Sequence, residues 1–567
     1  PAIKKDIFVL YRQLQLKTAA LGVLTLFSGV MAVLARFEVP LPDFLLPNGG
    51  ETLGYVLWNL AVLLIGGLLS LNIFRNGWRS FLHMQGDVDL PLAAAGTFCL
   101  LQTLYLLINR DALADGSSCL YTPVLLFALF LNGAGKLFLM KRTRNNFRFI
   151  ISSEPKYAMH MVETREEAAK LVNLPTEELA ISYCAPTSLL AKFLHISYAY
   201  DRSEQMTQKY SIWMVVACIG TAILNFILTF RVESALQTLC VAACICVPVT
   251  NLLCINIPVY QSGKRLLKKG VMLSGGAAVE QFGDSNFLMV RDTDLFPKGT
   301  VTLHLIKTFS QQRVDEAILD AAALICATGG PMSDMFSQII QGKSDMLPKV
   351  DGIEQEDGKG VVGWVGGRRV LIGNGALMEQ YGMMSPSRDF EEKYNGDGQF
   401  ISYLAVGGDL VAMFVMDYAV DEEVAIQVQN LADQGIHLAV RTMDSNITSV
   451  MLAQKFDIPS HKAVILGNEE GKRFDAYREE TPEADALLGV SGRFHAVAQG
   501  LLACKKLKNV ISLSMILQAL SVVLGFVLVF FLVIASGISQ LSAFEAFIFQ
   551  LFWTVVIVGN SLLRKYR

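Results

Sequence analysis

Charged side chains are scarce in this chain. Asp, Glu, Lys and Arg make up 17% of its 567 residues, whereas hydrophobic residues make up 52%. A soluble globular domain carries about 25% charged residues, so this composition argues against an ordinary soluble protein and predicts a membrane protein with several domains. The net charge is -3, and the basic residues lie beside apolar stretches rather than in a tail. Nothing in the charge pattern therefore indicates a nucleic-acid partner.

The sequence also lacks the cysteine patterns of a disulfide framework or a soluble zinc site. None of its ten cysteines forms a CxxC pair, and seven lie in or beside apolar stretches: Cys99, Cys119, Cys218, Cys240, Cys244, Cys246 and Cys254. We therefore expect neither disulfides nor structural zinc. There are no internal repeats and no low-complexity tract. The first apolar run is too long for a signal-peptide core, which predicts a retained membrane anchor.

Eight apolar stretches are long enough to cross a bilayer, which takes about 20 residues in a helix. They run over 18–36, 54–74, 90–108, 120–140, 212–230, 236–260, 510–536 and 541–563. Lys and Arg cluster at alternate ends of these stretches, so the positive-inside rule places both termini and both long insertions in the cytoplasm. We expect an integral membrane protein whose main partner is the lipid bilayer.

The insertion 261–509 is large enough for two domains. Near 286–302 and 435–442, short apolar runs end in Thr and Asp and are followed by helical patterns, as in a parallel α/β sheet with its site at the strand tips. The stretch between them contains a Gly-rich hairpin candidate at 360–373, which predicts an inserted α+β domain. The other insertion, 142–210, is predicted to form two or three helices, near 165–172 and 188–195.

Four stretches carry a resemblance to a known family. Residues 269–280 read KGVMLSGGAAVE, similar to KGILIKGGxALE; Gly358-Lys359-Gly360-Val361 and Val370-Leu371-Ile372-Gly373-Asn374 resemble the GxGV and VGN signals; and 555–564 end in NSLLR, similar to NxLR. Together with six spans, a large α/β insertion and two further spans, these stretches resemble the heavy-metal-transporting P-type ATPases of the CPx type. The signals occur in family order over most of the chain.

The resemblance implies a multidomain membrane protein with an eight-helix transmembrane bundle. Helices 1–4 would occupy 1–141, helices 5–6 would occupy 211–260, and helices 7–8 would occupy 510–567. A haloacid-dehalogenase-like P domain would occupy 261–325 and 416–509, and a nucleotide-binding-like α+β domain would occupy 326–415. A reduced helical segment would occupy the actuator position, 142–210. It further implies ATP, Mg²⁺ and a transition-metal cation as ligands, and a bacterial plasma membrane as the location.

The phosphorylation motif departs from the family. In DKTGTLTxG, the Asp forms an acyl-phosphate and the Thr positions the phosphoryl group. Aligned on Thr293 and Gly299, this chain has Arg291 at the nucleophile's position, and a guanidinium cannot attack phosphorus. A shift of one residue would make Asp292 the nucleophile but would break the Thr and Gly spacing. Asp292 and Asp294 also form a DxD pair, which serves as nucleophile and general acid in soluble haloacid-dehalogenase phosphatases.

Four further family motifs are altered or missing. The TGD loop reads Thr442-Met443-Asp444, so Asp292, Thr293, Thr442 and Asp444 are the catalytic candidates. The GDGxND loop, whose carboxylates hold Mg²⁺, has no counterpart between 467 and 510, so we expect only a weak Mg²⁺ site at most. The actuator's TGE loop needs a glycine-permitted turn, yet 142–210 contains no glycine. The HP dipeptide, whose histidine contacts adenine, is replaced by Gly330-Pro331.

The resemblance also supplies metal and nucleotide candidates. Cys244 and Cys246 lie in the sixth span, where the family has its CPC metal site, and thiolates suit soft cations; Pro248 and Asn560 complete the metal candidates. Cysteines in apolar helices are more simply small hydrophobes. Residues two apart also point in different directions in an unbroken helix, although unwinding at Pro248, where we expect a kink, would change that.

The nucleotide candidates are Gly358, Gly360, Gly373 and Asn374. Their glycines would let a backbone approach ATP, or would equally build hairpin turns. The missing or altered catalytic parts favour a pseudo-pump, a relative of heavy-metal transporters that has lost the aspartyl-phosphate cycle and acts in cation binding, transport or regulation. The alternative is a divergent but active ATP-driven cation exporter.

Overall fold

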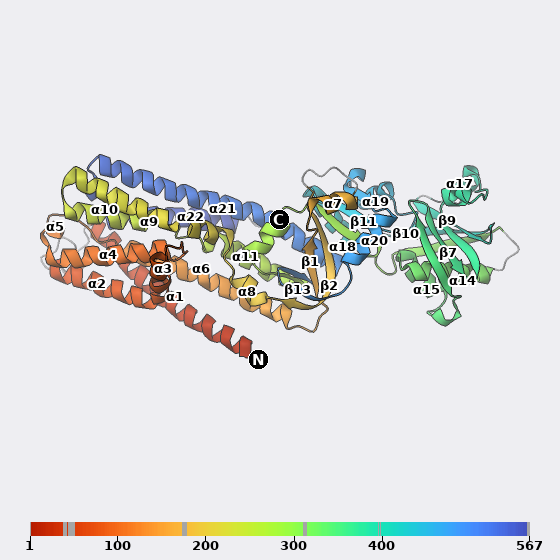
Figure 1. Cartoon of the computed structure of the whole chain (residues 1–567), viewed down its shortest axis with the longest axis horizontal. Coiled ribbons are helices and arrows are strands. Elements are labelled where there is room, and N and C mark those ends of the chain that lie inside the picture. The colour runs from red at the N-terminus through yellow and green to blue at the C-terminus, as the bar shows by residue number, and fades with distance from the viewer. Residues whose placement is uncertain are drawn as a thin grey trace.

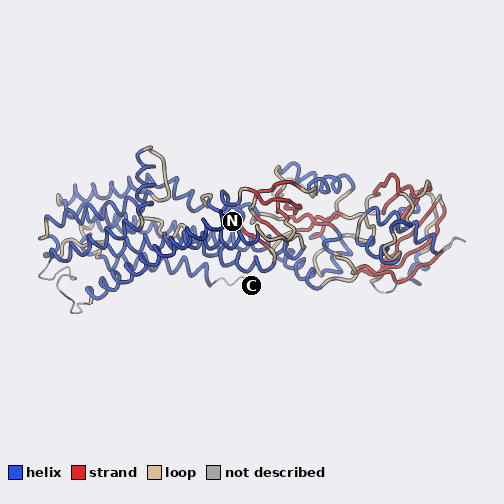
Figure 2. The backbone as a smooth tube through the Cα atoms, turned by 90° about the horizontal axis from the view of Figure 1, so that it is seen from below, coloured by secondary structure: helices blue, strands red, loops and turns tan. Residues whose placement is uncertain are grey.

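The computed structural model describes residues 2–37, 42, 52–172, 179–309, 314–394, 396 and 398–563. A long helical bundle forms one end of the molecule, and two β-sheets follow one another at the other end (Figure 1; Figure 2). The first helix begins and the last helix ends at the end of the bundle that faces the sheets (Figure 1). Arg564, which closes the NSLLR stretch, lies outside the described residues.

Seven helices of the described chain are long and apolar enough to cross a membrane. They are α1 (Ala2–Arg36), α2 (Thr52–Leu69), α4 (Leu90–Ile108), α6 (Thr122–Ile150), α9 (Arg202–Thr229), α21 (Phe494–Ile534) and α22 (Ala543–Leu563). Short elements join them: α3 (Leu71–Leu82), α5 (Asp111–Ala114) and η5 (Ile538–Gln540). These helices correspond to every predicted span except the sixth.

The sixth predicted span consists of two helices, α10 (Val232–Ile245) and α11 (Leu253–Leu266). The break contains Pro248, whose ring nitrogen has no hydrogen to donate to the carbonyl of Cys244 four residues earlier. The side-chain amide of Gln550 on α22 takes over that bond, with its Nε2 at 2.5 Å from the Cys244 oxygen. The expected kink is therefore a full interruption, stabilised from a neighbouring helix.

The first sheet lies next to the bundle, and its strand order is β12-β11-β4-β2-β1-β14-β3, with β13 also paired to β2. The strands are β1 (Tyr157–Met161), β2 (Ile181–Ala191), β3 (Val271–Leu273), β4 (Phe287–Arg291), β11 (His437–Arg441), β12 (Ala463–Ile465), β13 (Thr481–Asp485) and β14 (Leu488–Val490). β12, β11, β4 and β2 run parallel. Their carboxyl ends therefore meet at one edge, as predicted for the α/β domain.

Helices flank this sheet on both sides. They are α7 (Arg165–Val172), α8 (Phe193–Tyr198), α12 (Gly276–Phe282), α13 (Asp292–Leu295), α18 (Glu422–Asp433), α19 (Ser449–Phe456) and α20 (Asn468–Tyr477), with short turns η2 (Leu267–Lys269) and η4 (Ser460–Lys462). One core cluster joins Leu171 of α7 and Ile181 of β2 to Phe287 of β4 and Phe474 of α20. The segment 142–210 therefore shares a core with the rest of the α/β domain.

The helical prediction for 142–210 is wrong in part. α7 lies where it was expected, but the second predicted helix, near 188–195, is divided between the end of β2 and the start of α8. The segment supplies β1 and β2 to the first sheet. Both faces of a central strand are buried, so its sequence lacks the alternation of an edge strand, and a short apolar run cannot be told from a helix by periodicity.

The second sheet lies farthest from the bundle, in the order β5-β10-β9-β8-β7-β6 (Figure 1). Its strands are β5 (Val301–Thr308), β6 (Val350–Glu356), β7 (Gly360–Val365), β8 (Arg368–Gly373), β9 (Gln399–Val406) and β10 (Asp409–Tyr418). Its helices are α14 (Val314–Thr328), α15 (Pro331–Ile339), α16 (Gly375–Gln380) and α17 (Arg388–Tyr394), with the turn η3 (Ser344–Met346).

The boundaries expected for the inserted domain, 326–415, need correction. β5 pairs antiparallel with β10 from Val301 to Thr308, so the sheet begins inside the stretch assigned to the P domain and extends to Tyr418. α14 belongs with it, because Leu324 packs against Gly363 of β7. The hairpin predicted at 360–373 is present as β7 and β8. Its turn residues Gly366 and Gly367 both have positive φ, 55° and 80°, which favours glycine.

Candidate functional site

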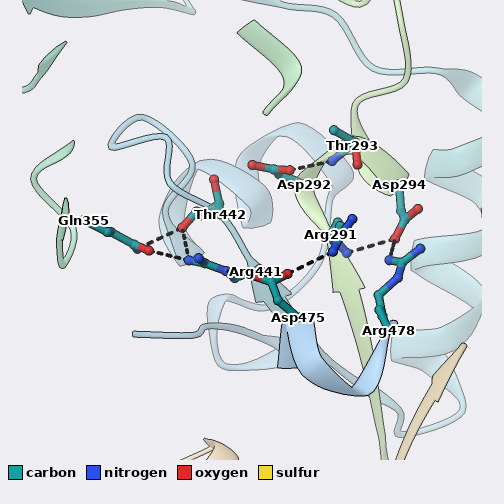
Figure 3. A network of polar contacts seen from close by, with 9 residues as sticks. All are labelled: Arg291, Asp292, Thr293, Asp294, Gln355, Arg441, Thr442, Asp475 and Arg478. Carbon is teal, nitrogen blue, oxygen red and sulfur yellow. Dashed lines mark hydrogen bonds and ion pairs between the residues drawn. The ribbon is translucent and has the colours of Figure 1, made fainter. Parts of the chain in front are cut away.

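The catalytic candidates meet at the carboxyl ends of β4 and β11. Arg291, the last residue of β4, is the register partner of Arg441, the last residue of β11. Asp292 begins the one-turn helix α13, and Thr442 begins the loop after β11. Figure 3 shows these side chains gathered around the strand tips, with Asp292 beside Thr293, Asp294 beside Arg478, and Asp475 between Arg291 and Arg441. The structure therefore brings together residues that are distant in the sequence.

Asp292 has a buried side chain, with 5% of its surface exposed. Its Oδ1 accepts a hydrogen bond of 2.7 Å from the backbone nitrogen of Thr293. Burial raises the pKa of Asp292 to about 7; the charge of Asp444 also raises it, whereas a hydrogen bond with Thr442 lowers it. Gly330, between α14 and α15, lies next to the carboxyl group, since a Cβ added to Gly330 would lie 3.4 Å from Oδ2.

Arg291 points away from Asp292. Its guanidinium donates to Oδ1 of Asp475 on α20 at 3.0 Å, while Nε of Arg441 donates to Oδ2 of the same carboxylate at 3.1 Å (Figure 3). Asp475 therefore bridges the arginines that end the two strands. Thr442 therefore faces the carboxyl group of Asp292. Arg291, which the motif alignment places at the nucleophile's position, faces Asp475 instead.

Asp294 has two partners of its own. Its Oδ2 accepts from the backbone nitrogen of Arg291 at 2.9 Å and from the guanidinium of Arg478 at 2.7 Å. A third arginine thus lies beside the strand tips. Because an ionised carboxylate with a guanidinium partner is already neutralised, Asp294 is poorly suited to act as the general acid of a DxD pair.

Asp444 is bound to the second sheet. Its Oδ2 accepts a hydrogen bond from the hydroxyl of Tyr418 on β10, and its Oδ1 accepts from the backbone nitrogen of Asn446 at 2.9 Å. Asn446 in turn donates to Ser402 of β9 at 2.9 Å. Burial raises the pKa of Asp444 to about 6. The carboxyl group of this TGD-like loop therefore takes part in a contact between domains.

Strand β6 of the second sheet closes the site from the other side. Nε2 of Gln355 donates to the carbonyl of Thr442 at 3.0 Å, and Oε1 of Gln355 accepts from Arg441. Two residues later, Oδ1 of Asp357 accepts from the backbone nitrogen of Asn468 at 2.7 Å, at the first residue of α20. An acidic group at a helix N-terminus is favourable. The two domains are thus held together directly over the strand tips.

These residues do not fit a magnesium ion. Mg²⁺ needs hard oxygen ligands in nearly octahedral geometry, but Asp294 and Asp475 are paired with arginines, and Asp292 and Asp444 are buried and hydrogen-bonded. Within the described residues, no group of three or more His, Cys, Asp or Glu side chains is arranged to hold a metal ion.

The actuator-position segment lies directly beside β4. In the parallel pairing of β2 with β4, Ile181 is the partner of Phe287 and Ser182 the partner of Leu288. The hydroxyl of Ser182 donates to Ser285 at 2.8 Å. On the sheet surface, the ring of Tyr183 lies 5.0 Å from that of Tyr477 on α20. The sequence contained no signal for this pairing.

The four nucleotide candidates occupy one corner of the second sheet. Asn374 caps α16 by accepting from the Leu377 nitrogen at 3.2 Å, and its Nδ2 donates to the carbonyl of Gly358 at 2.9 Å. Gly360 and Gly373 are partners on β7 and β8. A Cβ on Gly373 would lie 2.0 Å from the Lys359 oxygen, so the close approach of the strands already requires glycine there.

The four metal candidates are not brought together. Cys244 faces α4, with its Sγ at 3.7 Å from that of Cys99, whereas Cys246 packs against Gly525 of α21. Asn560 bonds Ser514 of α21 at 2.9 Å. It lies ten residues beyond Gln550, the partner of Cys244, and therefore about 15 Å farther along α22. Pro248 produces the helix break described above.

The Cys99–Cys244 pair was missed from the sequence. The two thiols belong to different helices and are separated by 145 positions. Cys99 lies in a largely apolar run, where a cysteine is most simply a small core residue. Only the packing of α4 against α10 brings the sulfur atoms together.

No family model matches the chain. It is 26% identical over 300 residues to a copper-exporting P-type ATPase of Legionella pneumophila, which covers 50% of this chain and 40% of the relative. It is also 24% identical over 205 residues to a silver exporting P-type ATPase of Salmonella typhimurium, covering 36% of this chain and 25% of the relative. This chain is related to the heavy-metal P-type ATPases. It spans less than half the length of these relatives.

The chain is also similar to a solved zinc-transporting PIB-type ATPase in its E2.Pi state, with 13% sequence identity and a TM-score of 0.45. The match covers 97% of this chain and 99% of the solved chain. P-type ATPases in general use ATP and Mg²⁺ and move cations across membranes.

Proposed function

We propose that this protein is a pseudo-pump, a membrane relative of heavy-metal P-type ATPases that does not run an aspartyl-phosphate cycle and acts by binding a cation or a regulatory partner. The observation that carries the proposal is the position of β2, which is hydrogen-bonded beside β4, the strand that ends at Asp292. In the family, the actuator segment must move to bring a glutamate to the acyl-phosphate. Here that segment is part of the sheet.

The energy of this packing argues against such a movement. Leu171, Val172 and Ile181 of the segment are 1%, 4% and 0% exposed. Burying an apolar side chain contributes about 1.5–3 kcal/mol, so removing these three would cost about 5–9 kcal/mol. The net stability of a whole domain is about 5–15 kcal/mol. Withdrawing β2 and α7 in each cycle would therefore amount to unfolding much of the domain.

The chemistry of Asp292 supports the same proposal. A phosphorylated aspartate must be ionised and open to the terminal phosphate of ATP. A pKa of about 7 leaves about half of the Asp292 side chains protonated at neutral pH, and only 5% of the residue is exposed. Where Mg²⁺ would neutralise phosphate, the strand tips already carry Arg291, Arg441 and Arg478 paired with carboxylates.

For the remaining activity, we propose binding of a soft monovalent cation by the thiols of Cys99 and Cys244, which lie within 3.7 Å of each other. Silver binding to the purified protein provides the test. Cys244→Ser should abolish one bound Ag⁺, and Cys246→Ser, two residues away but packed on α21, serves as the matched control that keeps it. Equal loss in both variants would contradict this assignment.

We further propose a bacterial plasma membrane as the location, with both termini in the cytoplasm. α1 begins and α22 ends on the side of the sheets (Figure 1), and the positive-inside rule favours that side as cytoplasmic. The bacterial relatives support the host. We expect tags at either end of the chain to react with a membrane-impermeant label only after the membrane is permeabilised.

A divergent but active exporter is the second candidate. It is favoured by one observation, the contact between the carboxyl group of Asp292 and Thr442 at the strand tips, since a nucleophile beside a phosphate-positioning Thr is what the reaction needs. In that case Asp292, and not Arg291, would be the phosphorylated position. The GxGV and VGN-like corner around Asn374 would then receive ATP.

ATP hydrolysis in proteoliposomes separates the two candidates. The full chain and Asp292→Asn are compared with ATP and Mg²⁺ in the presence of Cu⁺, Ag⁺, Zn²⁺ or no added cation. The pseudo-pump predicts equal background rates for both proteins with every cation. Hydrolysis that a cation stimulates and that Asp292→Asn abolishes would establish the exporter instead.

A further inference from the structure

A cavity of about 310 Å³ lies at the end of the bundle that is opposite the sheets. It is bounded by the end of α1 and the beginnings of α2, α6 and α22, whereas α1 begins and α22 ends on the side of the sheets (Figure 1). Its polar lining consists of Ser28, Arg36, Tyr55, Asn59, Cys119 and Ser542. A cavity of this size holds several water molecules. The thiol of Cys119 is therefore in contact with a hydrated space.

Cys119 connects this cavity to two buried amide groups. Nε2 of Gln237 on α10 donates to Sγ of Cys119 at 3.6 Å, and Nε2 of Gln102 on α4 donates to the carbonyl of Cys119 at 3.0 Å. Both glutamines are 1% exposed, and their side-chain oxygens accept no hydrogen bond within the described part of the chain. Buried oxygens of this kind are satisfied by water. The amides thus continue the hydrated space inward from Cys119.

The same two amides lead to the thiol pair. Gln102 follows Cys99 by three residues on α4, and Gln237 precedes Cys240 by three residues on α10. Each step is about 4.5 Å along its helix and stays on one face. The thiol of Cys240 lies beside that of Cys99, whose Sγ is 3.7 Å from that of Cys244. Polar groups and thiols therefore follow one another from the cavity to the pair.

The space on the other side of the pair is much tighter. The cavity beside the interrupted sixth span has a volume of only about 10 Å³, which is room for about one water molecule. Its lining is mostly apolar and includes Val88, Leu92, Val247, Pro248 and Val249. A hydrated cation that approached from the sheets would have to lose its water among apolar side chains, which is costly.

We propose that a soft monovalent cation reaches Cys99 and Cys244 from the side of the membrane opposite the sheets, through the cavity and past Cys119. This route depends on the thiol pair being the cation site, as proposed above. Along it, amide oxygens and thiols replace the water around the cation one after another. An exporter would have to take its cation from the cytoplasmic side. Access from the opposite side fits a protein that binds the cation as a signal and not as cargo.

The charges at the mouth of the cavity do not oppose a cation. Arg36 makes an ion pair with Glu545 at 3.2 Å, and the other carboxylate oxygen of Glu545 accepts from the backbone nitrogen of Ser542 at 3.0 Å. The guanidinium is thus neutralised by a neighbouring carboxylate. Each thiol that binds the cation does so as a thiolate and releases one proton. That proton leaves along the same hydrated route to the water of the cavity.

The side from which silver binds tests the route. Membrane vesicles that contain the full chain are prepared in two orientations, which are distinguished by whether an added protease cuts the sheets. Ag⁺ is added outside in nitrate buffer, and mass spectrometry measures the initial rate at which the silver lost in Cys244→Ser becomes bound. We expect this rate to be about tenfold higher or more when the sheets are enclosed, since one polar contact corresponds to about tenfold in rate.

Equal or faster binding when the sheets are exposed would overturn the route. Absence of Cys244-dependent silver even in detergent would contradict the thiol pair itself, and with it the proposed function and the route together.

Two amide-to-leucine variants locate the route within the bundle. Gln237→Leu places an apolar side chain between Cys119 and Cys240 and should slow silver binding in detergent by about tenfold or more. The matched control, Asn132→Leu, changes an amide that lines the small cavity beside Pro248 and should leave the rate unchanged. Both variants should bind the same final amount of silver, which shows that they are folded. An unchanged rate in Gln237→Leu, or slower binding in Asn132→Leu, would overturn the proposal.

Discussion

At the scale of single residues, the three arginines at the strand tips are paired with carboxylates. Asp475 forms ion pairs with both Arg291 and Arg441, and Asp294 forms one with Arg478, so three cations share two carboxylates (Figure 3). Such a set stabilises the tips without any ligand. An enzyme that must receive ATP and Mg²⁺ would instead need carboxylates free to bind the ion, with space around them.

The raised pKa of Asp292 predicts a pH-dependent stability. Its pKa is about 7 in the folded state and about 3.9 in an unfolded chain. The folded state therefore binds the proton more tightly, so this stabilisation is complete below about pH 4 and is lost as the pH rises through 7. Asp292→Asn should flatten this dependence and be more stable than the wild type at pH 8, by up to about 4 kcal/mol.

Thermal unfolding in detergent at pH 5 and pH 8 measures this effect. Asp444, with a pKa of about 6, keeps its own dependence in the variant, so the slope should shrink rather than vanish. If Asp292→Asn is less stable than the wild type at pH 8, the ionised carboxyl group is favoured in the folded state, which contradicts a raised pKa of Asp292.

The bridging role of Asp475 gives a second prediction. Asp475→Asn leaves the guanidinium of Arg441, whose side chain is 5% exposed, without its charge partner. Because the Asp475 carboxylate is itself 37% exposed and Arg441 keeps its bond to Gln355, this should cost about 1–3 kcal/mol. Arg291→Gln removes the other half of the bridge, but that side chain is 43% exposed, so it should cost about 1 kcal/mol or less. Chemical denaturation compares the two variants. Similar losses in both would contradict the assigned burial.

At the scale of elements, the interrupted sixth span depends on a helix elsewhere in the sequence. Gln550 supplies the hydrogen bond that Pro248 cannot make to the carbonyl of Cys244. Gln550→Leu should therefore destabilise the bundle by about 1–3 kcal/mol, the cost of an unsatisfied buried carbonyl. Adding Pro248→Ala restores a backbone N–H at the break and should recover part of that loss.

Thermal unfolding of the two single variants and the double variant forms a double-mutant cycle. We expect the double variant to be more stable than the sum of the single effects predicts. Additive effects would mean that Gln550 and the break are not coupled.

α7 is the element that joins the actuator-position segment to the sheet. Leu171 is 1% exposed and packs in the core that contains Ile181, Phe287 and Phe474. Leu171→Ala should cost about 2–5 kcal/mol and speed hydrogen exchange in β2 and β4 together, because they share that core. Glu166→Ala, on the exposed face of the same helix, should stay within about 0.5 kcal/mol. Faster exchange in β2 alone would show that the segment moves independently.

Part of this architecture could be predicted from the sequence. The long apolar spans are recognisable because twenty apolar residues are sufficient in themselves. Asp292 and Thr442 each follow a short apolar strand, and the ends of parallel strands meet at one edge. The state of β2 could not be predicted, because it pairs not only with the nearby β1 but also with β4 and β13, about a hundred and about three hundred residues away. The same holds for β5 and its distant partner β10.

At the scale of the whole molecule, the domains form a continuous structure from the membrane to the second sheet. α6, α11 and α21 extend from the bundle toward the first sheet (Figure 1). At that boundary, the buried guanidinium of Arg142 donates to Asn256 at 2.8 Å and to the carbonyl of Ser197 at 3.1 Å. Farther out, Gln355 and Tyr418 attach the second sheet to the strand tips. Direct contacts thus connect the bundle to the first sheet and the first sheet to the second.

The most direct test of a lost phosphoenzyme cycle is covalent labelling. Membranes containing the full chain, Asp292→Asn, or an active copper-exporting relative are incubated with ATP labelled at the terminal phosphate, quenched in acid and treated with hydroxylamine. We predict label released by hydroxylamine only in the active relative, with this chain and its variant equal at background. Acid-stable label on this chain that hydroxylamine releases and Asp292→Asn abolishes would contradict the pseudo-pump.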